Sequence, residues 1–295
     1  MTSDEISINS IVQAFSNDRW SGAHALALHA LKILERVIAH ARSLPPREGK
    51  MLFLKTAEDL IAGQPAMAIV LNTVSRIENL VRHSKKEWQK AASSAVGELR
   101  RQIEEAPERI GTHALRVVPP RSAIMVLSFS STILHIIKEL HSHGKRPSLV
   151  VLESRPLLEA RRLATAAARM GVPVTLFVDA AVQEAVRRSD VVLFGADAIL
   201  QDGSLIHKVG SYPVALAARE EKKPVYVACE SLKVLQHNDN RLDWRKGRDP
   251  SSVWSHPPSG IRPENVLFDH TSARLISGYL TEFGFGKKPL VKAKI

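Results

Sequence analysis

Residues 191–218, VVLFGADAILQDGSLIHKVGSYPVALAA, decide the fold of this chain. They open with a short apolar run, residues 191–194, whose length and β-branched side chains are typical of a buried parallel strand. Gly195-Ala196-Asp197 follows and places a carboxylate at the carboxyl end of that strand, where open α/β sheets bind ligands. Asp202-Gly203 indicates a turn. The stretch therefore predicts a strand with a candidate ligand site at its end.

The second half of the stretch has the composition of an anion site. His207 and Lys208 stand before Gly210 and Ser211, and a helix-like run begins at Pro213, which suits a first helical turn. A cation, a glycine and a hydroxyl before a helix N-terminus suit a phosphate or another anion. We therefore take His207 and Lys208 as candidate ligand-binding residues.

The order of GAD, a DG turn and HKVGSY resembles the superfamily of the alpha, beta and delta regulatory subunits of initiation factor 2B. Methylthioribose-1-phosphate isomerase and ribose-1,5-bisphosphate isomerase are members of the same superfamily. His207 stands for the usual Asn and Ser211 for the usual Thr. The resemblance covers nearly the whole chain through the further segments ESRP (153–156), DAA (179–181), VLFDHT (266–271) and TEFG (281–284).

The composition indicates a folded protein rather than a disordered one. The chain has 295 residues, 44% of them hydrophobic, and this length accommodates one or two domains with a sizeable core. No apolar run reaches the roughly eighteen residues that span a bilayer. The N-terminus is acidic where a signal peptide has a basic region, and the single Cys229 excludes an internal disulfide framework. We expect a cytoplasmic protein without a membrane segment.

The chain is basic, with a formal net charge of +11. Such a balance is compatible with an acidic ligand or a nucleic acid. The excess, however, is scattered through predicted helices and a short tail, and no zinc-finger or RNP-type motif accompanies it. We do not expect direct recognition of nucleic acid.

Residues 1–118 are predicted to form a helical N-terminal domain. Apolar residues at helical spacing predict a helix over residues 21–41, with Ser21 as its N-cap, and further helices over 51–62, 67–83 and 85–105. Pro45-Pro46 is expected to end the first helix, residues 47–50 to form a loop, and Pro107 to end the last helix.

Residues 119–295 are predicted to form a Rossmann-like α/β domain with a parallel sheet. Short apolar runs alternate there with helical segments, which is the pattern of βαβ units. The first strand is not followed by G-x-G-x-x-G, so we expect no dinucleotide and no other cofactor, and we identify no metal site. Residues 236–263 are expected to form a long loop. The predicted strands are residues 124–129, 149–152, 172–178, 191–194 and 225–228.

Three other polar segments follow predicted strands and should meet Asp197 at one edge of the sheet. Ser130 and Ser131 precede a helix, where hydroxyls and free N–H groups suit an anion, although either serine also suits a simple N-cap. Arg155 has the side chain for bidentate phosphate contacts, although an exposed loop arginine is equally ordinary. Asp179 fits a ligand site or a helix cap.

The resemblance also implies ligand contacts from residues 18–23, DRWSGA. The isomerases carry an R-G-A segment there. Gly22 matches its glycine, whereas the preceding arginine is missing and Arg19 is the only nearby substitute.

The isomerases open a furanose 1-phosphate and shift a proton between C1 and C2, which requires two positioned proton-transfer groups. The resemblance implies a cysteine after the first strand of this domain and the aspartate of GAD. Asp197 matches the aspartate, but Ser128 stands at the cysteine. A serine hydroxyl is a much weaker acid than a thiol and needs an adjacent base, and residues 124–133 contain none. Cys229 follows a different strand and reads as a small buried hydrophobe.

Two hypotheses of different classes follow. In the first, the chain is a non-catalytic regulatory homologue that binds a phosphorylated sugar or a nucleotide. In the second, it is an aldose–ketose isomerase for a ribose 1-phosphate-type sugar, with Asp197 as acid and base. In both, the resemblance implies a homodimer or a higher even oligomer, and in the first also a protein partner of the initiation-factor type.

Overall fold

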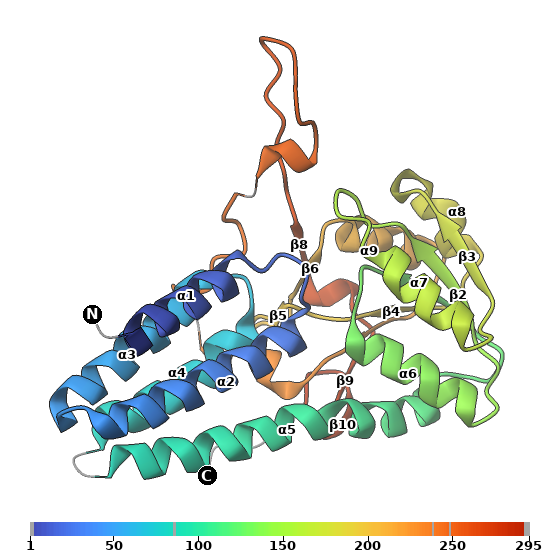
Figure 1. Cartoon of the computed structure of the whole chain (residues 1–295). Coiled ribbons are helices and arrows are strands. Elements are labelled where there is room, and N and C mark those ends of the chain that lie inside the picture. The colour runs from blue at the N-terminus through green and yellow to red at the C-terminus, as the bar shows by residue number, and fades with distance from the viewer. Residues whose placement is uncertain (1–2, 85–86, 238, 248, 292–295) are drawn as a thin grey trace. The chain divides into compact units, whose positions relative to one another are not determined.

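The computed structural model describes residues 3–84, 87–237, 239–247 and 249–291. The chain forms two compact units (Figure 1). One unit runs to Glu105 and includes Asp239–Asp243, and the other begins at Ala106 and contains the rest. The division falls inside a helix, and the predicted domain boundary after residue 118 lies at the end of that helix. That residues 119–295 are an autonomous domain stays a prediction.

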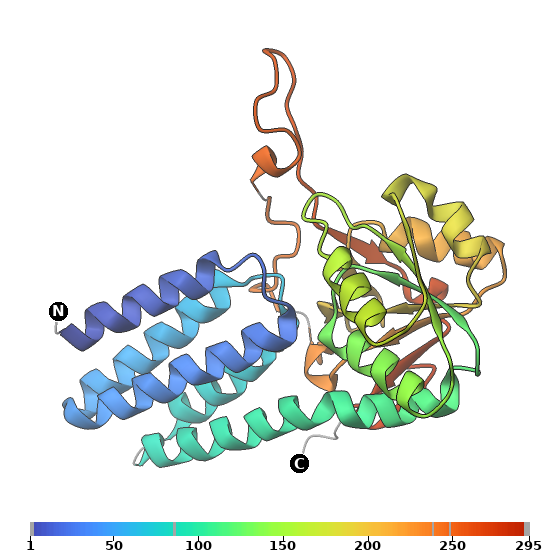
Figure 2. The ribbon, with the colours of Figure 1, turned by 45° about the vertical axis from the view of Figure 1, so that its right-hand side comes forward.

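The first unit is a bundle of helices (Figure 2, blue to cyan). Large apolar side chains such as Phe15, Leu34, Phe53 and Leu60 are completely buried in it, because each helix carries them at helical spacing on one face. The helices are α1 (Ser3–Asn17), α2 (Ala23–His40), α3 (Pro46–Gly63), α4 (Ala68–His83) and the first part of α5 (Trp88–Val117), with the short 3-10 helix η1 (Ala41–Ser43) after α2.

Three predicted helix boundaries are wrong. Residues 47–50 are helical because Pro46 lies in the first turn of α3. The N–H groups of a first helical turn have no acceptor within the helix, so a proline there costs no helical hydrogen bond. Gly22, not Ser21, is the N-cap residue of α2. Pro107 lies inside α5 rather than ending it. Ala106 and Ile110 on either side of Pro107 are buried in the core of the second unit. The free energy gained from this burial outweighs the unfavourable helix propensity of proline.

The second unit contains a seven-stranded sheet in the order β10-β9-β7-β4-β1-β2-β3. All neighbours are parallel except β10, which runs antiparallel to β9. The helical N-terminal region followed by a mostly parallel α/β sheet confirms the predicted fold class. The strands are β1 (Ala123–Leu127), β2 (Ser148–Leu152), β3 (Val174–Phe177), β4 (Val191–Phe194), β7 (Val225–Ala228), β9 (Gly278–Thr281) and β10 (Gly284–Gly286).

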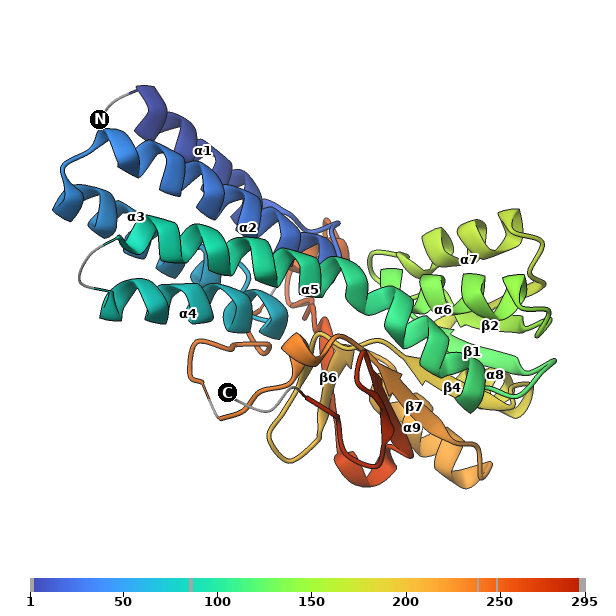
Figure 3. The same cartoon turned by 90° about the horizontal axis from the view of Figure 1, so that it is seen from below.

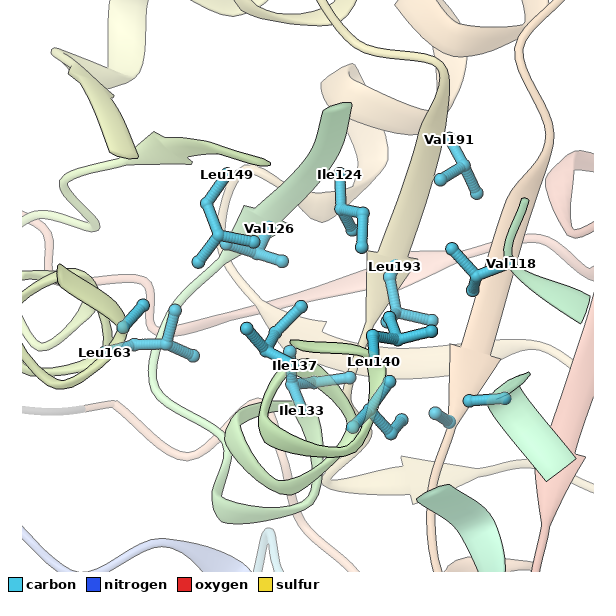
Figure 4. Packing of buried hydrophobic residues seen from close by; sticks show 14 of the residues in the cluster. Val118, Ile124, Val126, Ile133, Ile137, Leu140, Leu149, Leu163, Val191 and Leu193 are labelled. Carbon is cyan, nitrogen blue, oxygen red and sulfur yellow. The ribbon is translucent and has the colours of Figure 1, made fainter. Parts of the chain in front are cut away.

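Helices cover both faces of this sheet (Figure 3). Ile124 and Val126 of β1 face a core formed with α6, α7 and the end of α5 (Figure 4), whereas Met125 and Leu127 face α8 and α9. This alternation follows from the two-residue period of a strand and explains why the central strands are apolar throughout. The helices are α6 (Ser131–Ser142), α7 (Ala160–Arg169), α8 (Val182–Arg187) and α9 (Ser211–Glu220), with 3-10 helices η2 (Asp179–Ala181) and η3 (Ser231–Lys233).

A second, antiparallel sheet has the order β5-β6-β8, with β5 (Ala198–Ile199), β6 (Leu205–Lys208) and β8 (Phe268–Thr271). His207 and Lys208 are therefore the last residues of a buried strand. Between β7 and β8 the chain is largely irregular, as predicted, and contains η3 and η4 (Pro250–Ser252); η5 (Ala273–Leu275) follows β8. Within the described part of the chain, no helix combines the length and apolar character needed to cross a membrane.

Candidate functional site

Polar side chains of the second unit gather where its parallel strands end. Parallel strands place their carboxyl ends along one edge of the sheet, which is where open α/β sheets bind ligands. Three buried acid–base pairs lie in this region, and each joins a cationic or basic side chain to a carboxylate. They are Lys208 with Glu159, His207 with Asp197, and Lys233 with Glu230.

The first pair includes Ser128, the residue directly after β1. Its hydroxyl donates a hydrogen bond to Oε1 of Glu159 (2.9 Å), and Nζ of Lys208 lies 2.9 Å from the same oxygen. The other oxygen of Glu159, Oε2, is buried and has no hydrogen-bond partner among the described residues. The predicted site residues Ser128 and Lys208 are thus brought together by a glutamate that sequence reasoning missed. Glu159 is the N-cap residue of α7. An acidic side chain at that position is common because it interacts favourably with the positive end of the helix dipole, so nothing in the sequence marked it as a site residue.

Ser128 is held in an uncommon backbone conformation. Its φ of 68° lies in the left-handed region, which non-glycine residues seldom adopt. Its N–H donates to Oγ of Ser154 (2.8 Å), and the N–H of Ser154 donates to the Asp179 carboxylate (2.8 Å). These two hydrogen bonds connect the ends of β1, β2 and β3 and hold the backbone at Ser128.

The second pair is Asp197, after β4, with His207 on β6. Oδ2 of Asp197 lies 3.3 Å from Nδ1 of His207, and the ring of Phe194 lies 5.7 Å from the imidazole. The Asp197 N–H donates to the carbonyl of Ile206, so the β5–β6 turn folds the two predicted residues onto each other. When Nδ1 carries the hydrogen toward the carboxylate, Nε2 is an acceptor. Nε2 is buried and lacks a hydrogen-bond partner in the described chain.

Ser130 lies next to this pair. It is the N-cap of α6, and its hydroxyl accepts from the N–H of Ile133 (3.3 Å), so the predicted capping role is confirmed. A Cβ atom at Gly195 would lie 3.0 Å from Oγ of Ser130 and 3.6 Å from Cε1 of His207. Glycine thus permits both side chains to approach the end of β4. Ser131 is the exposed first residue of α6, and anion binding by the two serines stays a prediction.

The third pair, Glu230 and Lys233 after β7, was also missed by sequence reasoning. Nζ of Lys233 lies 2.8 Å from Oε2 of Glu230, and the Thr132 hydroxyl donates to Oε1 (3.3 Å). Burial has the largest effect on the pKa of Lys233 and would lower it, but the charge of Glu230, with a contribution from Asp197, raises it overall. Because Glu230 directly follows the Cys229 that ends the apolar run, its place after a strand was a signal in the sequence.

Cys229 itself has no accessible reactive thiol. It is completely buried, and burial raises the pKa of its thiol to about 12. A thiolate is the reactive form of cysteine, so this residue does not replace the missing cysteine at position 128.

Arg155 and Asp179 lie at the ends of β2 and β3. The Asp179 carboxylate accepts from the N–H groups of Ser154 (2.8 Å) and Arg155 (2.6 Å), so it orders the loop after β2 rather than capping α8. The Arg155 side chain is exposed, and the Arg155–Pro156 peptide bond is cis. A phosphate contact by Arg155 stays a prediction.

The expected anion site at the start of α9 is wrong. Oδ2 of Asp269 accepts from the N–H groups of Gly210 (2.8 Å) and Tyr212 (3.0 Å), so a carboxylate of the chain already occupies this helix N-terminus. Ser211 is fully buried, 3.3 Å from the Thr271 hydroxyl. Strand β8 pairs with β6 and places Asp269 opposite His207, a long-range arrangement that local sequence does not reveal.

Gly22 belongs to the helical unit, where it precedes α2, and nothing lies within 4 Å of a Cβ atom built on it. Its predicted ligand contact stays a prediction. Among the residues that the structure describes, no three His, Cys, Asp or Glu side chains are grouped so that they could hold a metal ion.

Comparison with known proteins places this geometry in context. The sequence model of the family described as "Initiation factor 2 subunit family" matches residues 19–288. The chain is 30% identical over 234 residues to ribose 1,5-bisphosphate isomerase of Archaeoglobus fulgidus, covering 77% of this chain and 74% of that protein. It is 28% identical over 280 residues to a putative translation initiation factor eIF-2B subunit 2-like protein of Pyrococcus horikoshii, covering 93% and 94%. The crystal structure of translation initiation factor eIF-2B from Pyrococcus horikoshii OT3 superposes with a TM-score of 0.83 at 26% identity, covering 96% of this chain and 98% of that chain.

Proposed function

Because the chain belongs to the Initiation factor 2 subunit family, we propose that it is a regulatory-type homologue that binds a phosphorylated sugar or a nucleotide. The proposed binding site is the carboxyl edge of the parallel sheet in the second unit. We further propose that the protein is cytoplasmic and forms homodimers or higher even oligomers, with a protein partner of the initiation-factor type.

The observation that carries this proposal is the burial of two lysine ammonium groups at the sheet edge. Lys208 and Lys233 have side chains that are 6% and 5% exposed, and each is matched by one carboxylate. Burying a charge costs free energy unless the charge is paired, so we take two buried ammonium groups at this edge as candidates for a binding role. A phosphate that enters beside α6 would find these cations together with the N–H groups and hydroxyls at the start of that helix.

An isomerase is the second candidate function, and the contact between Ser128 and Glu159 favours it. The sequence argument against catalysis was that Ser128 lacks an adjacent base. Glu159 is such a base, because its carboxylate accepts the hydrogen of the Ser128 hydroxyl at 2.9 Å. Asp197, the second group that the chemistry requires, lies 3.3 Å from the imidazole of His207.

A phosphorus NMR time course separates the two functions. Ribose 1,5-bisphosphate and then methylthioribose 1-phosphate are mixed with stoichiometric protein, alongside the Asp197→Asn variant. We expect broadened substrate signals without product for the regulatory homologue. New ketose resonances that disappear in the variant would instead establish the isomerase, and sharp, unchanged signals with both sugars would contradict sugar-phosphate binding.

A further inference from the structure

We propose that the free edge of the seven-stranded sheet, strand β3, binds an extended acidic segment of a partner protein, which adds a strand to the sheet. The inference rests on the proposed protein partner, for which it names a docking surface and a chemistry. The docking surface lies within the second unit and consists of residues 174–178 with the exposed arginines of residues 155–188.

The first step of the argument is the set of backbone groups that β3 turns away from the sheet. β3 is the last strand in the sheet order, and β2 is its partner among the described strands. The carbonyls of Pro173 and Phe177 accept hydrogen bonds from the N–H groups of Leu149 and Glu153 at 2.8 and 3.0 Å. Backbone groups of successive strand residues point to opposite edges, so those of residues 174 and 176 face away from β2. An added strand can pair with them.

The second step is the apolar character of this edge. Leu176 is 45% exposed, and Val178, directly after the strand, is 59% exposed. Val174 packs into the core formed with α7, and side chains two residues apart share a face, so α7 leaves Leu176 half exposed on that face. Edge strands are commonly protected by a charge, a proline or a bulge. Pro173 stands only before the first residue of β3, and residues 174–178, VTLFV, contain no charge.

The third step is the arginine-rich surface around β3. Residues 155–188 contain six arginines and no lysine, and all six arginines are exposed. Figure 1 shows β3 between α7 and α8, and the arginines belong to these two helices and to the loop before α7. Arginine is the side chain suited to bidentate contacts with carboxylates. The six are Arg155, Arg161, Arg162, Arg169, Arg187 and Arg188.

The carboxylates of residues 155–188 are already engaged within the chain. Glu159 pairs with a lysine, Asp179 accepts from backbone N–H groups, and Glu184 pairs with both arginines at the end of α8. Arg161 pairs with Glu153. One carboxylate shared by two guanidinium groups leaves an excess of positive charge at α8. Exposed ion pairs contribute little stability, so these arginines can turn to the carboxylates of a partner.

Charge and backbone together select the occupant of the docking surface. A second copy of the chain would bring the same arginines to this edge, and like charges would oppose pairing of β3 with β3. A nucleic acid matches the arginines, but it offers no row of N–H and C=O groups to a strand edge. An extended peptide with acidic side chains matches the free backbone groups, the exposed apolar residues and the positive charge.

The two faces of β3 predict the side-chain pattern of the added strand. Leu176 is exposed on the α7 face, whereas on the α8 face the Arg188 guanidinium lies 5.6 Å from the centre of the Phe177 ring. Alternate side chains of a strand point to opposite faces of its sheet. We therefore expect apolar residues of the partner beside Leu176 and acidic residues beside Arg188.

The test measures binding of fluorescein-labelled peptides to the full chain by fluorescence anisotropy at low salt. The first probe alternates Glu and Val. The second has Lys in place of each Glu, and the third has Pro in place of each Val, so that it keeps the charge but loses half of its backbone donors. A labelled polyuridine oligonucleotide is the probe for nucleic acid.

The variants separate the backbone contribution from the charge contribution. Leu176→Pro removes an outward N–H without removing a hydrogen bond to β2, and proline is tolerated on the free side of an edge strand. Leu176→Ala keeps the N–H and removes the apolar contact. The double variant Arg187→Gln with Arg188→Gln removes two charges, and Arg101→Gln at an exposed position of α5 is its matched control. Urea denaturation checks that each variant is folded.

We expect the wild-type chain and Arg101→Gln to bind the Glu–Val peptide much more tightly than the other three probes. Leu176→Pro should lower the affinity about tenfold or more, and by more than Leu176→Ala, because one net hydrogen bond is lost and the ring obstructs pairing. The double arginine variant should lower the affinity about tenfold at low salt and reduce the salt dependence of binding. Hydrogen exchange of residues 173–178 should slow when the peptide binds.

Equal affinity of folded Leu176→Pro and wild type would overturn strand addition at β3. Equally tight binding of the oligonucleotide or of the proline-containing peptide would show that charge alone governs binding, and would also overturn it. A fall in the mass of Leu176→Pro from an even multiple to 32.5 kDa would show that a second copy occupies the edge instead. Absence of binding of the Glu–Val peptide to wild type would overturn this docking surface alone, because the phosphorus NMR experiment tests the proposed ligand site separately.

Discussion

Lys233 shows how a single residue depends on its neighbours at this site. Its side chain and that of Glu230 are 5% and 1% exposed, and their charged atoms lie 2.8 Å apart. Replacement by methionine leaves the Glu230 carboxylate buried without its cation. We expect Lys233→Met to lower the free energy of unfolding by about 3–5 kcal/mol, as measured by urea denaturation near neutral pH.

The control is the double variant Lys233→Met with Glu230→Gln, which removes the uncompensated charge and should recover part of the loss. The direction of the pKa shift adds a second check. The pKa of Lys233 is raised above its ordinary 10.5, so its contribution is complete below that pH and is lost as the pH rises through the higher folded-state pKa. The difference in free energy of unfolding between wild type and Lys233→Met should therefore become smaller only in strongly alkaline solution. A difference that becomes smaller near neutral pH would contradict a raised pKa of Lys233.

Helix α5 carries the most specific prediction for a single element. It has 30 residues and contains Pro107 in its interior. Proline has no N–H for the carbonyl four residues earlier, which is that of Ile103, and its ring crowds the preceding turn. We expect Pro107→Ala to raise the free energy of unfolding by about 1–3 kcal/mol, measured by urea denaturation.

Glu108→Ala, at an exposed neighbouring position of α5, is the control and should change stability by less than about 0.5 kcal/mol. A loss of stability in Pro107→Ala would show that the proline ring, which is partly buried, contributes more through packing than it costs in backbone hydrogen bonding.

At the scale of the whole molecule, the proposal that an even number of copies assemble predicts the molecular mass of the protein in solution. The chain has a mass of 32.5 kDa, so light scattering coupled to size-exclusion chromatography should give twice this value or another even multiple. We expect the same mass across a tenfold range of protein concentration, because stable interfaces between copies remain closed on dilution. A monomer at every concentration would contradict the prediction.

Much of the second unit could be predicted from local pattern. The apolar runs that became β1, β2, β4 and β7 lie within one or two residues of their predicted places, since short runs of buried apolar residues are typical of central parallel strands. Helix ends were less predictable. Pro46 and Pro107 were both predicted to interrupt helices, but Pro46 begins α3 and Pro107 lies within α5. Whether a proline ends a helix depends on the helical turn in which it lies and on the packing of its neighbours.

The sequence by itself determined the parallel sheet and polar residues that follow its strands, such as Ser128 and Asp197, whereas the structure places His207 and Lys208 on the second, antiparallel sheet. Strand periodicity and the order of apolar and polar residues are local properties, so they can be recognised from the sequence alone. Tertiary structure alone decided which charges meet. Glu159 joins Ser128 to Lys208, and Asp269 fills the start of α9, through contacts between residues 31 to 59 positions apart. Such pairs depend on how strands and helices pack, and this packing cannot be predicted from local sequence patterns.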